Sequence, residues 1–234
     1  MENTKKVNEE LIEFWNSAIS LSNEFKEQIK EEIPDYKELA PSLKLFDAAK
    51  ELGNCKKVLD YGCGSGWASI IAAKSGCRDV LSVDLGQNII DTINFYARLY
   101  EVDDKLHASL ISADWLSTVD SDLFDGFICS NVLDVVPIET SESIIKEISR
   151  IVTKDAKIII GLNFYLSNEQ AKSRDMELVD GKYLFVNGVL RLTSLSDDEW
   201  SNTISKYFDV IKIDHFAWPG EKSETRRLFF LKRK

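Results

Sequence analysis

The chain has 234 residues, of which 44% are hydrophobic and 29% charged, and its formal net charge is −10. This length suits one domain that buries a sizeable core without disulfides or metals. The acidic balance argues against a nucleic-acid partner, and no apolar run approaches the roughly 20 residues that span a bilayer, so we expect no membrane partner either.

The start of the chain and its cysteines point to a compartment. Residues 1–6 lead into acidic, polar sequence rather than into the apolar core of a secretory signal. The four cysteines lack metal-ligand spacing and are interpreted as reduced thiols; they are Cys55, Cys63, Cys77 and Cys129. We therefore predict a cytoplasmic protein without a metal site. Its oligomeric state does not follow from the sequence.

Residues from about 8 to 52 are predicted to be helical. Apolar residues recur there at helical spacing: Leu11, Phe14, Trp15, Ala18, Ile19 and Leu21. Pro34 and Pro41 divide the segment, and a second amphipathic stretch ends near Gly53. We expect residues 1–53 to form a helical cap on the rest of the chain.

From residue 54 the pattern alternates between short apolar runs and helical stripes. The runs predict strands at residues 58–59, 79–84, 106–112, 124–130 and 157–160. The stripes predict helices at residues 68–74, along 89–100, and on a face made of Ile144, Ile148, Ile151 and Val152. Such alternation indicates an α/β fold, a Rossmann-like, mostly parallel sheet doubly wound by helices.

The final third departs from this rhythm. Asn187-Gly188 lies between two apolar runs and predicts a hairpin. Ser196 and Glu199 form a capping box that opens a helix. Residues 208–216 and 227–231 are expected to close the sheet as an antiparallel pair. Residues 54–234 then form one domain with a lid-like insertion at about 165–195.

The turn after the first predicted strand carries the strongest functional signal. Gly62, Gly64 and Gly66 let the backbone approach a ligand, and the helix that follows offers free N–H groups. Asp84, at the end of the second strand, can accept hydrogen bonds from both ribose hydroxyls. A dinucleotide turn has its third glycine one residue later. Asp60 would also repel a pyrophosphate and attract an ammonium group.

With Asp60-Tyr61-Gly62-Cys63-Gly64-Ser65-Gly66, the sequence resembles the class I S-adenosylmethionine-dependent methyltransferases, whose first motif reads roughly [DE]-x-G-x-G-x-G. The resemblance extends from about Lys56 to Leu162. It implies S-adenosyl-L-methionine as the cofactor and S-adenosyl-L-homocysteine as the product. It also implies a sheet whose last strand is antiparallel.

The resemblance assigns cofactor-binding roles to particular residues. Asp60 would help to hold the methionine ammonium group, the three glycines and Cys63 would form the backbone cradle, and Asp84 would bind the ribose. Near the adenine we expect Leu85, Asp114 and Trp115, and near the methionine moiety Ser130 and Asn131.

Methyl transfer from a sulfonium requires little side-chain chemistry beyond holding the acceptor in line. A general base is needed only when the acceptor is protonated, and Asp134 and His215 are the candidates, with Tyr165 behind them. The acceptor is expected between the N-terminal helices and the insertion, near aromatic residues: Trp15, Tyr36, Phe164, Tyr165, Tyr183 and Phe185.

We interpret the chain as an enzyme that methylates a small molecule. One alternative keeps the cofactor but makes the acceptor a peptide or protein side chain. Another is a non-catalytic S-adenosylmethionine-binding protein. The residues Asn131-Val132-Leu133-Asp134 replace the [ND]-P-P-[FYW] motif of amino-methylating branches, which lowers the expectation of adenine or glutamine N-methylation. A dehydrogenase is disfavoured by the glycine spacing.

Overall fold

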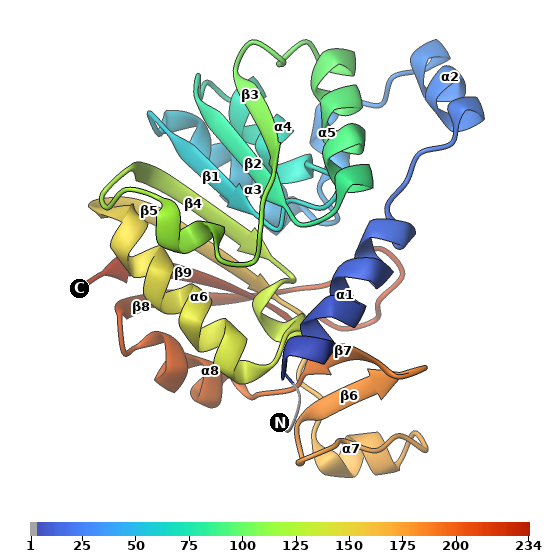
Figure 1. Ribbon diagram of the computed structural model, residues 1–234, viewed down its shortest axis with the longest axis vertical. Helices are drawn as coiled ribbons and strands as arrows, with labels where there is room; N and C mark the ends of the chain where they lie inside the picture. Colours follow the sequence, from blue (N-terminus) through green and yellow to red (C-terminus); the bar gives the residue numbers. More distant parts are fainter. Residues whose placement is uncertain (1–3) are drawn as a thin grey trace.

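A computed structural model describes residues 4–234, and its centre is a seven-stranded sheet (Figure 1). The strand order is β3-β2-β1-β4-β5-β9-β8. The strands are β1 (Val58–Tyr61), β2 (Val80–Asp84), β3 (Leu106–Leu110), β4 (Phe124–Ser130), β5 (Val152–Leu162), β8 (Phe208–Phe216) and β9 (Arg226–Arg233). All neighbours from β3 to β5 are parallel, whereas β9 runs antiparallel to β5 and to β8. The predicted fold class, with its antiparallel last strand, is confirmed.

Helices cover both faces of the sheet because side chains alternate along each strand. Val58 packs in one core with α3 (Leu43–Glu51), α4 (Trp67–Lys74) and α5 (Gln87–Leu99). Leu59 packs in the other core with α6 (Ile138–Ile151) and α8 (Asp197–Ile204). Short 3₁₀ turns connect these elements: η1 (Tyr36–Leu39), η2 (Leu52–Asn54), η3 (Trp115–Thr118) and η4 (Leu133–Val135).

The N-terminal segment lies beside the carboxyl ends of the parallel strands. Helix α1 (Thr4–Ala18) runs from the hairpin of β6 (Tyr183–Val186) and β7 (Val189–Thr193) towards α5 (Figure 1). Helix α2 (Asn23–Glu31) contains no buried residue and projects from the body. Helix α3, by contrast, shares its core with α4. The domain division at residue 53 stays a prediction.

The local signals in the final third gave the expected structures. Asn187 (φ 52°) and Gly188 (φ 81°) turn β6 into β7, and Ser196 and Glu199 form both hydrogen bonds of the capping box of α8. The insertion also contains α7 (Asn168–Lys172), which has a capping box of its own.

One boundary was predicted incorrectly. Val152 does not extend the face of α6 but begins β5, where it pairs with Phe124. The strand therefore starts before residue 157 and continues through a register shift opposite Phe124 and Gly126. Val152 directly follows the apolar helix residue Ile151, and the local pattern does not show its pairing because the partner strand is distant in sequence.

The four cysteines are buried and unpaired. Within residues 4–234, none of the helices has both the length and the apolar character needed to cross a membrane.

Candidate functional site

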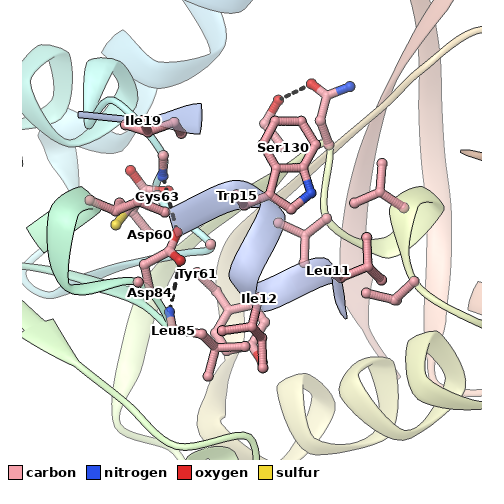
Figure 2. A pocket seen from close by; sticks show the side chains of 18 of the residues that line it. Leu11, Ile12, Trp15, Ile19, Asp60, Tyr61, Cys63, Asp84, Leu85 and Ser130 are labelled. Carbon is pink, nitrogen blue, oxygen red and sulfur yellow. Dashed lines mark hydrogen bonds between the residues drawn. The ribbon is translucent and has the colours of Figure 1, made fainter. Parts of the chain in front are cut away.

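A cavity of about 460 Å³ lies at the carboxyl ends of β1, β2 and β4, beneath α1 (Figure 2). Its volume falls within the range of roughly 300–1,000 Å³ typical of small-molecule sites. Open α/β sheets bind ligands at this edge. The turn at residues 62–65 forms one wall. Side chains of α1 and of Ile19, which directly follows the helix, form another; those of α1 are Leu11, Ile12, Trp15 and Asn16.

The glycine turn is held by backbone hydrogen bonds and by close contacts at Gly62 and Gly66. The amides of Gly62 and Cys63 both donate to the carbonyl of Val83, at 2.9 and 3.2 Å. Gly62 has φ +68°, and a Cβ there would lie 2.2 Å from Cγ2 of Val132. Gly66 has φ +76° and is the N-cap residue of α4. The backbone therefore forms an open cradle that faces the cavity.

Asp84 lies next to this cradle at the end of β2. Its Oδ1 accepts a hydrogen bond from the amide of Leu85 at 2.7 Å, and its Oδ2 one from Gly64 at 3.3 Å. Burial raises the pKa of the Asp84 carboxyl, and the amides of Gly64, Leu85 and Gly86 lower it. Each oxygen has a further lone pair, so the carboxylate can accept two hydroxyl groups of a ligand.

Asp60 also lines the cavity, although its side chain is almost completely buried. Its Oδ2 accepts a hydrogen bond from Oγ of Ser69 at 2.6 Å, and Ser69 in turn lies 2.6 Å from Oγ of Ser82. Burial raises the pKa of the Asp60 carboxyl to about 7, the hydrogen bond from Ser69 lowers it, and the charge of Asp84 raises it. A cationic ligand group would stabilise the charged form.

Asp60 should make ligand binding depend on pH. An ammonium group binds the carboxylate, so the affinity for S-adenosylhomocysteine should increase as the pH rises, by up to about tenfold per pH unit below the pKa, and level off above about 7. The stability of the free protein should change with pH in the opposite direction to the affinity. Between the ordinary value of 3.8 and about 7 the folded state holds a proton that the unfolded state has lost, so the free energy of unfolding falls as the pH rises.

Calorimetric titrations across this range check the expectation. Asp60→Asn should bind more weakly and lose the pH dependence of binding. Asp134→Asn is the matched control, because Asp134 is a buried carboxyl with a pKa of about 6 that does not line the cavity. An unchanged pH dependence in Asp60→Asn would show that Asp60 does not titrate with binding.

Helix α1 is held beside the cavity by hydrogen bonds to α5. Oδ1 of Asn16 accepts a hydrogen bond from the amide of Asn88 at 3.0 Å, and the carbonyl of Asn16 accepts one from Nδ2 of Asn88 at 2.9 Å. Ile19 lies over the glycine turn, with its Cδ1 3.9 Å from the position of a Cβ at Gly64. Figure 2 shows Leu11, Ile12 and Trp15 on this helix and Ile19 near Cys63 of the glycine turn. The helix therefore encloses the site.

Most of the predicted cofactor-binding residues come together at the cavity. Leu85, Ser130, Asn131 and Cys63 line it with Asp60, Asp84 and the first two glycines. Gly66 shapes the turn but does not line the cavity. Asp114 is fully exposed just outside, where Oγ of Ser112 donates to it at 2.5 Å and lowers the pKa of its carboxyl. Trp115 packs against the core beneath α6. The adenine roles of these last two residues stay predictions.

Neither candidate general base lines the cavity. Asp134 is completely buried in η4 and accepts a hydrogen bond from the amide of Asn163. Burial raises the pKa of its carboxyl, while that amide and the charge of Arg227 lower it. His215 lies on β8, where its Nε2 is 2.9 Å from Oδ2 of Asp197. Both side chains have structural partners away from the site.

Of the six aromatic residues expected near the acceptor, Trp15 lines the cavity and the other five do not. Tyr36 packs against Phe46, and Tyr183 is buried with Leu11. The sequence interpretation did not include Ser69 and Ser82, the partners of Asp60. Ser69 is a polar residue in an otherwise apolar run at 68–73, which was a usable signal. The sequence interpretation also missed Trp218, which lines the cavity from the β8–β9 loop.

The site fits the cofactor that the motif implies. Residues 62–65 of the glycine turn line the cavity, and Asp84 and Asp60 offer carboxylates for hydroxyl and ammonium groups. Among residues 4–234, no group of three or more His, Cys, Asp or Glu side chains could hold a metal ion.

The chain is similar in sequence to known methyltransferases. Residues 58–155 match the family model described as a methyltransferase domain. Over 79 residues the chain is 35% identical to the ribosomal protein L11 methyltransferase of Cupriavidus metallidurans. This alignment covers 34% of this chain and 25% of that protein. Over 82 residues it is 34% identical to the ubiquinone biosynthesis O-methyltransferase of Psychrobacter arcticus, covering 35% and 32%.

A solved structure extends the likeness beyond these segments. The magnesium protoporphyrin IX methyltransferase of Synechocystis PCC 6803, solved with bound S-adenosylhomocysteine, has a TM-score of 0.61 at 16% identity, and the match covers 82% of each chain. Residues 58–155 therefore match a methyltransferase domain in sequence, and the solved structure shows that the fold is shared over most of the chain. Its alignments span about a quarter to a third of the length of the two curated relatives described here.

Proposed function

We propose that this protein transfers the methyl group of S-adenosylmethionine to a small-molecule acceptor. The observation that carries the proposal is one cavity, whose lining includes the glycine turn, both carboxylates and side chains of α1. A donor and a small acceptor can therefore meet in one enclosed space. When bound, the cofactor's sulfonium supplies an activated methyl group, and the protein has to hold the acceptor in line with it.

Different residues of the cavity bind different parts of the cofactor. Asp84 holds the ribose hydroxyls, the turn at residues 62–64 follows the ligand closely, and Asp60 attracts the ammonium group. Ser130 and Asn131, at the end of β4, contact the methionine moiety. Helix α1 excludes water from the reacting atoms.

Thermal unfolding tests the proposal directly. S-adenosylhomocysteine should raise the melting temperature, because a ligand at one hundred times its dissociation constant stabilises the folded state by about 2.7 kcal/mol. NAD at the same concentration is the control and should have little effect, since Asp60 disfavours a pyrophosphate. No stabilisation by millimolar S-adenosylhomocysteine would refute the proposal.

A protein acceptor is the second candidate, because one set of relatives is described as ribosomal protein L11 methyltransferases. Incubating the protein with S-adenosylmethionine labelled in its methyl group and with a cell lysate separates the two. We expect the label in the low-mass fraction. Label in polypeptides would favour the second candidate, and cofactor binding without any transfer would favour a non-catalytic role.

A further inference from the structure

Two serines lie behind Asp60, in the core between the sheet and α4. Ser69 is the third residue of α4, next to buried alanine and isoleucine residues, and Ser82 lies on β2 directly beside Asp60 in the parallel register. Both serines are 0% exposed, and neither lines the cavity. A buried hydroxyl costs free energy unless it is hydrogen-bonded, and alanine is the better helix former at residue 69. The two hydroxyls therefore need an explanation other than packing.

The hydroxyls form a chain that ends on Asp60. Oγ of Ser69 lies 2.6 Å from Oδ2 of Asp60 and 2.6 Å from Oγ of Ser82. A carboxylate only accepts hydrogen bonds, and a serine has one proton to donate. When Asp60 is charged, Ser69 must therefore donate to Asp60, and Ser82 must donate to Ser69. Both protons of the chain then point towards the carboxylate.

This chain acts differently on the two protonation states of Asp60. A protonated Asp60 can donate to Ser69, which reverses the chain into a series of neutral hydrogen bonds. A hydrogen bond to an ionised acceptor is roughly twice as strong as a neutral one, and successive hydrogen bonds polarise one another. The chain therefore stabilises the charged form more than the neutral form, whereas burial favours the neutral form.

The other titratable groups around Asp60 do not stabilise its charge. They lie on the glycine turn, β2 and β4, and they are Cys63, Asp84 and Cys129. The charge of Asp84 raises the pKa of Asp60, and burial raises the pKa of both thiols, which keeps them uncharged. The hydroxyl and the amide of Ser69 both lower the pKa of Asp60. An alanine at residue 69 keeps that amide and removes the hydroxyl alone.

We propose that Ser69 and Ser82 are positioning residues for the cofactor, because their hydroxyl chain keeps Asp60 in the charged form that attracts the ammonium group of S-adenosylmethionine. This inference rests on the proposed methyl transfer and on the binding role of Asp60 in it. The serines act only through Asp60, whose side chain has the hydroxyl chain behind it and lines the cavity.

The test is the pH dependence of S-adenosylhomocysteine binding, measured by calorimetric titration of the full chain. Ser69→Ala should raise the pKa of Asp60 by about one pH unit. The affinity should then be about tenfold weaker than that of the wild type at about pH 6, and within about twofold of it at about pH 8.5, where Asp60 is charged in both proteins. Ionisation of the ligand is the same for both proteins and cancels. A loss of packing alone would weaken binding by the same factor at every pH.

Three further variants separate the hydroxyl chain from other effects. Ser82→Ala should shift the pH dependence in the same direction but less, because Ser69 keeps its own bond to Asp60. Ser141→Ala is the matched control and should keep the wild-type pH dependence. Ser141 is also a 0% exposed helical serine, but it does not line the cavity and its hydroxyl donates to the carbonyl of Leu133 at 2.6 Å. In an Asp60→Asn background, Ser69→Ala should not change the pH dependence, because the serine acts through Asp60.

The outcomes distinguish this proposal from the proposed function. A wild-type protein that does not bind S-adenosylhomocysteine at any pH would overturn the proposed function itself. If the ligand binds with an affinity that does not depend on pH, or if Ser69→Ala weakens it equally at every pH, the hydroxyl chain does not control Asp60. An unchanged pH dependence in both Ser69→Ala and Ser82→Ala, or a shift that persists with Asp60→Asn, leads to the same conclusion. In each of these cases the methyl-transfer proposal stands.

Discussion

Asp84→Ala should weaken the binding of S-adenosylhomocysteine by about a hundredfold or more, because two hydrogen bonds to a charged acceptor contribute about 3 kcal/mol together at the lower end of their range. The carboxylate also accepts the amides of Gly64 and Leu85, so the variant should lose some order in the glycine turn. Isothermal titration calorimetry measures the affinity, and thermal unfolding measures the loss of stability separately.

Asp79→Ala is the matched control for this experiment. Asp79 directly precedes β2, at the opposite end of the strand from Asp84, and pairs with Lys57 at the surface at 3.1 Å. Its removal should leave the affinity unchanged. An Asp84→Ala protein that binds within twofold of the wild type would exclude Asp84 as the ribose ligand.

Gly62→Ala should be the most damaging single substitution in the cradle. The added Cβ would lie 2.2 Å from Cγ2 of Val132 and would require φ +68°. The left-handed conformation costs about 1–2 kcal/mol and overpacking about 1–3 kcal/mol more, so the free energy of unfolding should fall by about 2–5 kcal/mol in total. Binding of S-adenosylhomocysteine should weaken as well, because the turn must shift to relieve the overlap.

Gly188→Ala separates the conformational cost of the left-handed backbone from the cost of overpacking. Gly188 has φ +81° in the β6–β7 turn, and nothing lies within 4 Å of the position of an added Cβ. This variant should show only the conformational cost, with unchanged ligand affinity. Chemical denaturation measures the free energy of unfolding of both variants, and the difference between them is the cost of overpacking at residue 62. Adding Val132→Ala to Gly62→Ala should restore part of the stability, and equal losses in the two single variants would contradict the steric explanation.

The features that could be predicted from the sequence depend on interactions between near neighbours. The turn at Asn187-Gly188 needs two residues that accept positive φ, and the capping box of α8 needs Ser196 and Glu199 three residues apart. The strand, the glycine turn and the helix that follows it are likewise encoded within about 20 residues. These short-range requirements also led to the correct sheet, because alternating strands and helices have few ways to pack.

The composition of the cavity depends on contacts between distant segments. Helical periodicity predicts that one face of α1 is buried, but it does not say that Trp15 lines the cavity or that Leu11 packs with Tyr183 of β6. The same holds for Asp134, whose place just after β4 suggests a role in the site. In the folded chain its carboxylate instead points to the amide of Asn163 in the segment after β5.

By itself the sequence determined the class of fold, the glycine cradle and the positions of Asp60 and Asp84, because each follows from residue types at a short, regular spacing. Only the tertiary structure decided which side chains face the ligand space, which carboxyls are buried and how far their pKa values move. It also brought the guanidinium of Arg191 to 5.3 Å from the ring centroid of Trp15. Burial and through-space charge depend on segments that meet only after folding, and no local pattern contains that information.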